Sequence, residues 1–105
     1  MEIWTVVYSD EVQAWLDGLT AGQYATVRRV VARLEVAGNM LRMPLSKPLG
    51  EGLFELRFNL ENKARRITYT FQPEQRIITL TTFYKQKNNE RREILRARRA
   101  QKEQS

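Results

Sequence analysis

Four cationic side chains in the second half of the sequence are the residue types best suited to chemistry. They are Arg57, Arg66, Lys85 and Lys87, and they fall on or beside three expected consecutive strands. The sequence has no histidine and no cysteine, so the usual proton shuttle, thiol nucleophile and transition-metal ligands are missing. Cations can still bind phosphate, and Lys, Tyr or Glu can transfer a proton. These residues favour a protein directed at RNA, including a nuclease that works without histidine, metal or cofactor.

Charge is unevenly distributed along the 105 residues. Positions 1–41 carry three basic side chains against five acidic ones, whereas positions 42–105 carry fifteen basic against seven acidic, and the whole chain has a net charge of +6. A pI of about 10.1 with clustered cations indicates a nucleic-acid or acidic partner. A merely solvated, soluble surface is the alternative.

Length and composition bound the architecture. A chain of 105 residues with 42% hydrophobic content predicts one domain over 1–105, which can bury roughly 65% of its unfolded surface. No segment approaches the ~20 apolar residues of a membrane span, and no signal peptide opens the chain. Since cysteine is absent, no disulfide framework is possible, and we expect a cytoplasmic protein without membrane contact.

The first part of the chain is expected to form a strand and two helices. β-Branched and aromatic residues over 2–8 favour the strand. Ser9 can cap the first helix, and apolar residues then recur at helical spacing. Thr20 with Gln23 three residues later matches a capping box for the second helix, which Gly38 is expected to end. The prediction is a helical hairpin.

The rest of the chain is expected to form a meander of strands and a last helix. Proline and glycine between Met40 and Gly52 disfavour regular structure there. The expected strands are Leu53–Phe58, Ala64–Phe71 and Arg76–Tyr84, with turns at Asn59–Asn62 and Pro73–Glu74. Asn88 or Asn89 can cap a helix to about Lys102, whose thin apolar content predicts partial mobility. The order predicts an α+β fold, with the first strand beside the last in the sheet.

Strand alternation places two arginines on one face. Arg57 and Arg66 lie opposite the aromatic core positions of their strands, so both guanidiniums can face one groove if the strands pair. Two guanidinium forks can hold one phosphodiester and neutralise its growing charge. Alternatively, Arg57 belongs to a charge ladder with Glu55. One of Arg65 and Arg66 is expected to be a solvated turn residue, and a one-residue register error would exchange them.

The end of the third meander strand brings further reactive groups to the sheet's edge. Tyr84 could stack a base or donate a proton. Lys85 or Lys87, crowded by cations, could serve as a general base. Phe83 and Tyr69 are better explained as core residues.

Five segments of the second half resemble the HigB-like branch of the RelE/ParE toxin superfamily. They are residues 43–45 (MPL), 47–50 (KPLG), 52–57 (GLFELR), 66–69 (RITY) and 83–85 (FYK). The helical hairpin before them and the Arg-rich helix after them are similar too, so the resemblance covers nearly the whole chain. The run KPLG-x-GLFELR is its most specific part.

The resemblance implies a RelE-like fold and a ribosome-dependent messenger-RNA endonuclease. Its partners would be the 70S ribosome with messenger RNA and a small HigA-like helix-turn-helix antitoxin, with operator DNA reached only through that antitoxin. The family's catalytic arginines map to Arg57 and Arg66, and its cation after the last strand maps to Lys85, with Lys87 as a second choice. Relatives often have a Lys-Lys pair and a Thr-Pro step here, where this chain reads KQKNN. Glu55 stays a candidate base.

The remaining site residues are assigned to RNA or ribosome contact. They are Lys47, Lys63, Arg65, Arg91 and Arg92. The leading hypothesis is cleavage by attack of the RNA's own 2′-hydroxyl, in which Tyr84 orients the base. One rival is inhibition of DNA gyrase by binding, as in ParE-like members, and another is a plain nucleic-acid-binding module with a steep salt dependence.

Overall fold

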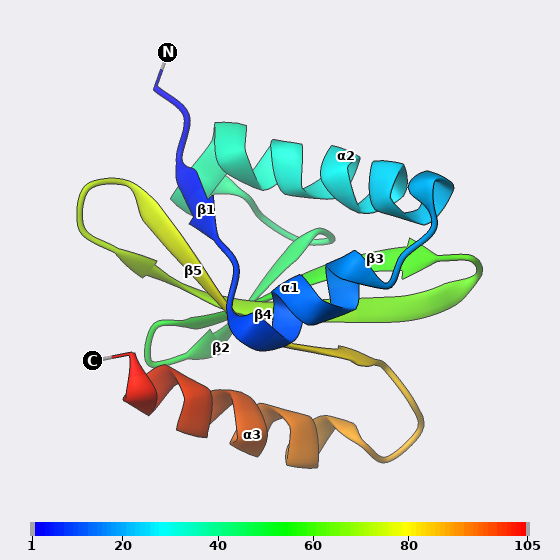
Figure 1. Ribbon diagram of the computed structural model, residues 1–105. Coiled ribbons are helices and arrows are strands. Elements are labelled where there is room, and N and C mark those ends of the chain that lie inside the picture. Colours follow the sequence, from blue (N-terminus) through cyan, green and yellow to red (C-terminus); the bar gives the residue numbers. More distant parts are fainter. Residues whose placement is uncertain (1, 105) are drawn as a thin grey trace.

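Residues 2–104, which the computed structural model describes, form one mixed sheet with helices on both faces (Figure 1). The strands are β1 (Thr5–Val7), β2 (Ser46–Gly50), β3 (Leu53–Leu60), β4 (Lys63–Gln72) and β5 (Arg76–Tyr84). They lie in the order β1-β5-β4-β3-β2, with β1 parallel to β5 and every other pair antiparallel. The expected α+β class is confirmed, and so is the place of the first strand beside the last.

The two N-terminal helices begin where the sequence predicts. They are α1 (Asp10–Asp17) and α2 (Ala21–Ala37), followed by the short 3-10 helix η1 (Gly38–Met40). The Ser9 hydroxyl accepts a hydrogen bond from the Val12 amide at 3.2 Å. Thr20 and Gln23 form the reciprocal capping box, with bonds of 2.9 and 3.2 Å. None of the helices within residues 2–104 has the length and apolar character needed to cross a membrane.

Gly38 ends α2 because no other residue fits at this point. Its φ is 53°, and a Cβ atom there would lie 2.1 Å from Nε1 of Trp4. Glycine therefore permits both the left-handed backbone and the close approach of the indole from the chain just before β1.

The main core lies between the sheet and the helical hairpin. Its buried members come from both helices and from β3, β4 and β5: Val12, Leu16, Val27, Val31, Leu34, Leu56, Phe58, Leu60, Ile67, Tyr69 and Ile77. Tyr69 has no exposed surface, which confirms its expected place in the core. Burial of this face sets which side chains of each strand remain for the opposite face.

The prediction of irregular chain from Met40 to Gly52 is wrong for Ser46–Gly50, which form β2, and for Met40, the last residue of η1. β2 is an edge strand paired with β3, and Pro48 is tolerated at an edge because its missing N–H breaks no interior ladder. The Ser46 hydroxyl forms a buried hydrogen bond with the Tyr69 hydroxyl. Tertiary pairing thus overrides the proline and glycine signals.

The two hairpin turns close as expected, with one difference in extent. β3 continues to Leu60, which pairs with Lys63, so the first turn contains only Glu61 and Asn62. Both residues have positive φ, 50° and 65°, as a two-residue type I′ hairpin requires. The strand predicted over Arg76–Tyr84 is confirmed at both ends.

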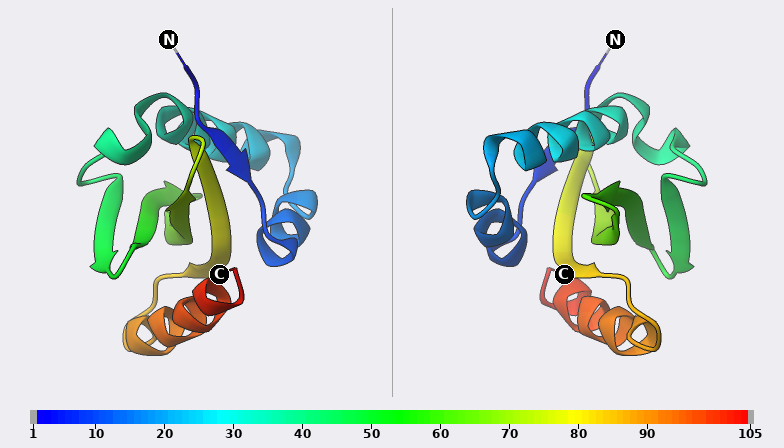
Figure 2. Two further views of the ribbon diagram at one scale, coloured as in Figure 1. Left: turned by 90° about the vertical axis from the view of Figure 1, so that its left-hand side faces the viewer. Right: turned by 90° about the vertical axis from the view of Figure 1, so that its right-hand side faces the viewer.

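The last helix, α3 (Glu90–Glu103), covers the opposite face of the sheet from α1 and α2 (Figure 2). Only Ala97 of α3 is buried, in a small cluster with Leu53, Ile78 and Leu80. Asn89 precedes the helix as predicted, but its side chain bonds the Tyr84 carbonyl and the Gln86 amide instead of capping. The thin apolar anchor matches expectation, and the mobility of α3 remains a prediction.

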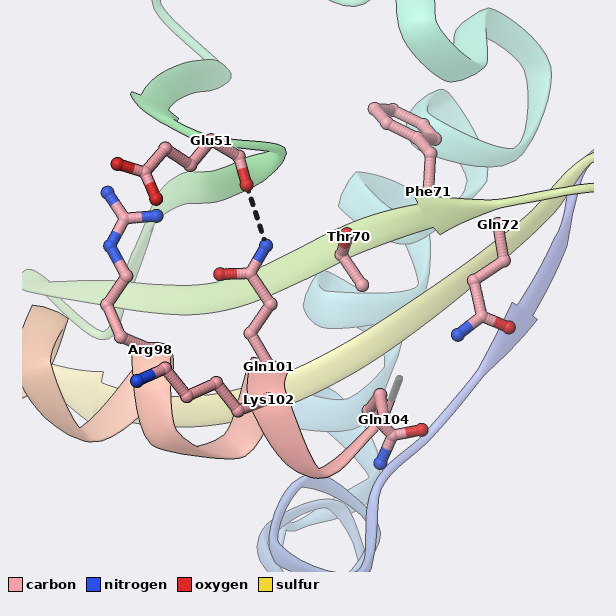
Figure 3. A pocket seen from close by; sticks show the side chains of 8 residues that line it. All are labelled: Glu51, Thr70, Phe71, Gln72, Arg98, Gln101, Lys102 and Gln104. Atoms are coloured by element: carbon pink, nitrogen blue, oxygen red, sulfur yellow. Dashed lines mark hydrogen bonds between the residues drawn. The ribbon is translucent and has the colours of Figure 1, made fainter.

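Polar contacts hold α3 onto the β2–β3 hairpin. Arg98 donates from Nη2 to the Leu49 carbonyl and from Nη1 to the Gly50 carbonyl, both at 2.7 Å. Gln101 donates to the Glu51 carbonyl at 2.9 Å (Figure 3). Backbone acceptors of a tight turn therefore substitute for apolar packing.

A register shift in β5 changes which face its end presents. Tyr69 pairs with Thr79 but Ile67 pairs with Thr82, so β5 carries one extra residue opposite Thr68. The Thr68 hydroxyl stabilises this bulge through the Thr81 hydroxyl at 2.6 Å and the Thr81 amide at 3.0 Å. As a result Phe83 lies opposite Arg66, and Tyr84 lies opposite Arg65.

Candidate functional site

Arg57 of β3 and Arg66 of β4 are directly opposed cross-strand partners. They lie on the same face of the sheet, so the predicted convergence of the two guanidiniums is confirmed. Nε of Arg66 lies 3.3 Å from Oε1 of Glu55, and Nε of Arg57 lies 3.8 Å from the same oxygen. One carboxylate is therefore shared by two guanidiniums.

Glu55 is buried beneath this pair, with a side chain only 2% exposed. Burial raises the pKa of the Glu55 carboxyl, and the positive charges of Arg66 and Arg57 oppose that rise. Burial likewise lowers the pKa of the Arg66 guanidinium, which the Glu55 charge opposes. The cluster thus holds desolvated charges whose mutual attraction only partly offsets their loss of hydration.

Hydrogen bonding within the cluster is incomplete. Oε2 of Glu55 and the Nε atoms of Arg57 and Arg66 are buried and have no hydrogen-bond partner of suitable geometry within residues 2–104. Buried polar atoms are rarely left so, and exceptions concentrate at functional sites. Both arginines line an open pocket, so an anion can bind their guanidinium groups there, whereas Oε2 of Glu55 would need a hydrogen-bond donor.

The two arginines line an open pocket beside the loop that precedes β2. The pocket has a volume of about 480 Å³, and Met43, Pro44 and Leu45 form its other wall. Nη1 of Arg57 contacts the Met43 sulfur at 3.3 Å, and Nη1 of Arg66 donates to the Arg65 carbonyl at 3.1 Å. Both guanidiniums therefore border this open pocket, and Arg57, with a side chain 29% exposed against 9% for Arg66, is the more accessible of the two.

Lysines follow the cluster along the same face. Lys47 of β2 is the cross-strand partner of Glu55, so the predicted loop lysine is in fact a strand residue. Lys85 leaves the end of β5, and its Nζ lies 3.7 Å from the Glu90 carboxylate. Lys47 and Lys85 both line a second open depression, of about 680 Å³, against α3. Lys87 is exposed in the loop before α3 and lines none of these pockets.

Tyr84 does not join the Arg57–Arg66 cluster. Its ring stacks on the Arg65 guanidinium at 4.3 Å from the ring centre, and Trp15 of α1 stacks on the same guanidinium at 4.3 Å. Nζ of Lys63 lies 5.4 Å from the Tyr84 ring centre. Because the bulge in β5 reverses the alternation, Tyr84 faces α1, away from Arg66.

The expectation that Arg65 or Arg66 is a solvated turn residue is wrong. The two residues are 6% and 7% exposed, because both lie inside β4. Nε of Arg65 donates to the Thr82 hydroxyl at 3.0 Å, which completes its place between the two rings. Trp15 gave no functional signal in the sequence, since its spacing only marks the apolar side of a helix.

The predicted contact residues on α3 are exposed. Arg91 and Arg92 lie in its first turn, next to the depression that contains Lys85. A separate pocket of about 400 Å³ lies between the other end of α3 and the end of β4 (Figure 3). It is lined by Gln72, Arg98 and Gln101 among others, and by none of the predicted catalytic residues.

Comparison with protein families gives a match over most of the chain. The model of the phage-derived Gp49-like proteins matches residues 14–102. The chain belongs to this family. A comparison with curated proteins finds no significant match for this Gp49-like chain.

Among solved structures, this Gp49-like protein matches a chain of the toxin–antitoxin complex RelBE2 from Mycobacterium tuberculosis. The TM-score is 0.59 at 19% sequence identity, and the match covers 79% of this chain and 99% of that chain. At this identity the likeness establishes the fold, and the expected RelE-like fold is confirmed.

Proposed function

We propose that this Gp49-like protein is the toxin of a type II toxin–antitoxin system, of the HigB-like branch, and that it cuts messenger RNA on the ribosome. The observation that carries the proposal is the opposed Arg57–Arg66 pair over the buried Glu55, because two guanidiniums that line one open pocket favour binding of an anion. The sequence resemblance and the RelE-like fold support the same interpretation.

The proposed chemistry is an internal transfer at one phosphodiester. The 2′-oxygen of the RNA attacks the adjacent phosphorus, a 2′,3′-cyclic phosphate forms, and the 5′-oxygen of the next nucleotide leaves and takes up a proton. Arg57 and Arg66 bind the non-bridging oxygens and neutralise the charge that grows on them. Preorganised guanidiniums need no reorganisation during the reaction, so they lower the barrier.

Glu55 and Lys85 receive different roles in this scheme. Glu55 faces the Nε atoms of both arginines and is shielded from solvent, so it positions the two guanidiniums, which together form the phosphate clamp. Lys85 lines the open depression on the same face and, as the neutral amine, accepts the 2′-hydroxyl proton to become the ammonium. A Glu55→Gln variant separates these roles: loss of activity with an unchanged pH profile supports positioning, whereas loss of the acid limb of the profile assigns the base to Glu55.

The partners follow from the same proposal. A HigA-like helix-turn-helix antitoxin binds the toxin, and the complex reaches operator DNA through the antitoxin. The 70S ribosome presents the messenger, in the cytoplasm. Lys47, Lys63, Arg91 and Arg92 contribute ribosome or RNA contacts, whereas the enclosed Arg65 supports the fold.

The test is expression of Arg66→Ala in cells, with growth and messenger cleavage as readouts. We expect the variant to lose growth arrest and translation-dependent cuts, while the matched control Arg76→Gln, exposed at the opposite end of β5, retains both. Undiminished arrest by Arg66→Ala would rule out Arg66 as a clamp. Gyrase-dependent DNA breaks without messenger cuts would instead support the ParE-like alternative.

A further inference from the structure

Apart from Lys85, the residues that line the depression between β2, the end of β5 and α3 have no role in the proposed bond-breaking chemistry. The depression has a volume of about 680 Å³ and is walled by Lys47 of β2 and, distant from it in sequence, by the segment from Lys85 into α3. That volume lies within the range of about 300–1,000 Å³ typical of small-molecule sites. Since Lys47 on its wall pairs with Glu55, the depression continues the face that carries Arg57 and Arg66.

Its lining combines cations with an apolar floor. Lys47, Lys85 and Arg91 supply the positive charge, while Ile94 and Leu95 of α3 supply the apolar surface. Leu95 is 53% exposed, so its aliphatic surface is available to contact a ligand. Glu90 is already paired with Lys85, so the depression keeps a net positive character.

The spacing along α3 extends this surface. Arg91, Leu95 and Arg99 recur every four residues and share one side of the helix. A neighbouring depression of about 630 Å³ is lined by Arg91, Leu95 and Arg99 together with Arg92 and Arg96. Arg98 and Arg96 bond to backbone carbonyls of the sheet, and Arg96 also bonds to Glu11. The helix therefore uses Arg96 and Arg98 to dock onto the sheet, whereas Arg91, Arg92 and Arg99 remain for a ligand.

We infer that this depression is a nucleotide-binding subsite, in which Leu95 and Ile94 support the base of the nucleotide next to the scissile phosphate and Arg91 binds its phosphate. That the bound nucleotide belongs to RNA rests on the proposed function. A nucleotide fits because its base has an apolar face while its backbone is anionic, which matches a floor of aliphatic carbon bordered by ammonium and guanidinium groups. Continuity with Arg57 and Arg66 favours RNA over an acidic peptide.

The experiment measures binding without cleavage, using a 2′-O-methylated single-stranded RNA oligonucleotide that has no 2′-hydroxyl to attack. An abasic residue is moved along the oligonucleotide one position at a time, and affinity is measured for the full-length protein by fluorescence anisotropy. At one position we expect the abasic residue to weaken wild-type binding about fivefold, since removal of a supported base costs part of a stacking interaction.

Two variants and a matched control decide the outcome. In Leu95→Ala, binding of the intact oligonucleotide should weaken about fivefold, and the abasic residue should cause no further loss, because the two changes remove one shared interaction. In Arg91→Gln, the slope of log affinity against log salt should become shallower by about 0.7, as expected when one phosphate of a single strand is no longer neutralised. Arg76→Gln, with the same change in charge, should match the wild type in both measurements.

Several results would overturn the subsite. One is a wild-type protein for which no position of the abasic residue matters. Another is a Leu95→Ala variant, folded by circular dichroism, that discriminates abasic RNA as the wild type does. A third is a polyglutamate peptide that displaces the oligonucleotide equally well from both proteins, since the surface would then recognise charge alone. If the wild-type protein cuts messengers but fails these tests, only the subsite is refuted. If it passes these tests but does not cut messengers, only the proposed nuclease activity is refuted.

Discussion

Arg65 and Arg66 are consecutive, equally buried, and placed in opposite kinds of environment. Arg65 lies between the rings of Trp15 and Tyr84, and its Nε donates to Thr82. Arg66 faces a second arginine and a buried carboxylate, and its Nε has no hydrogen-bond partner within the described chain. The Arg65 guanidinium is enclosed by partners within the fold, whereas the Arg66 guanidinium lines an open pocket in which an anion can bind. Incomplete hydrogen bonding, rather than burial or charge, distinguishes Arg66, the arginine that we propose binds phosphate.

The largest expected effect comes from breaking the Arg57–Arg66 pair. Each single alanine substitution should lower the cleavage rate about 100-fold, equivalent to about 3 kcal/mol of barrier. The double variant should lose less than the product of the two, because both groups bind the same phosphate. Translation-dependent messenger cleavage by purified protein measures all three variants. Strict multiplicativity would show that the two arginines act on separate groups.

Arg65→Ala should act on stability and leave the chemistry intact. The substitution removes two cation–π interactions and a buried hydrogen bond, so unfolding in urea should require about 2 kcal/mol less free energy. Cleavage per folded molecule should remain within about twofold of the wild type, since the side chain does not touch the clamp. A loss of activity as large as that of Arg66→Ala, without loss of stability, would contradict this division.

Tyr84 tests the difference between Arg65 and Arg66 further. The sequence predicts that Tyr84 lies beside the phosphate clamp, whereas in the structure its ring stacks on Arg65. Tyr84→Phe keeps the ring that stacks on Arg65, so activity should stay within about twofold. Tyr84→Ala should reduce the free energy of unfolding by about 1 kcal/mol because it removes the cation–π interaction. If the phenylalanine variant instead loses cleavage as strongly as a clamp variant does, the hydroxyl is a proton donor.

The smallest expected effect is a pH dependence of stability contributed by Glu55. Burial raises its pKa in the folded protein above the unfolded value, so the folded state binds the proton more tightly. This group's contribution is therefore most favourable below the unfolded pKa and declines as the pH rises through the folded pKa. Relative to Glu55→Gln, the wild type should lose stability over that window, measured by urea unfolding at a series of pH values. An increase in relative stability with pH would show that ion pairing with the arginines outweighs burial.

Local sequence signals predicted much of the scaffold because each depends on near neighbours. Ser9 and the Thr20–Gln23 pair cap helices through bonds three residues apart, and Gly38 supplies a left-handed backbone. Alternation along β3 and β4 placed Arg57 and Arg66 on one face, since the helical hairpin buries the other. β2 was missed because Pro48 and Gly50 carry strong turn signals, whereas an edge position in the sheet tolerates both.

What the sequence alone determined is the order of the elements other than η1 and β2, the shared face of Arg57 and Arg66, and the excess of basic residues, because these follow from periodicity, capping and composition. Only the tertiary structure decided that Tyr84 joins Arg65, that Glu55 lies buried between two guanidiniums, and that α3 forms the wall of a cationic depression. The physical reason is that a single extra residue opposite Thr68 reverses the alternation of β5 beyond it. Such a bulge depends on the partner strand, which no local pattern in β5 reveals.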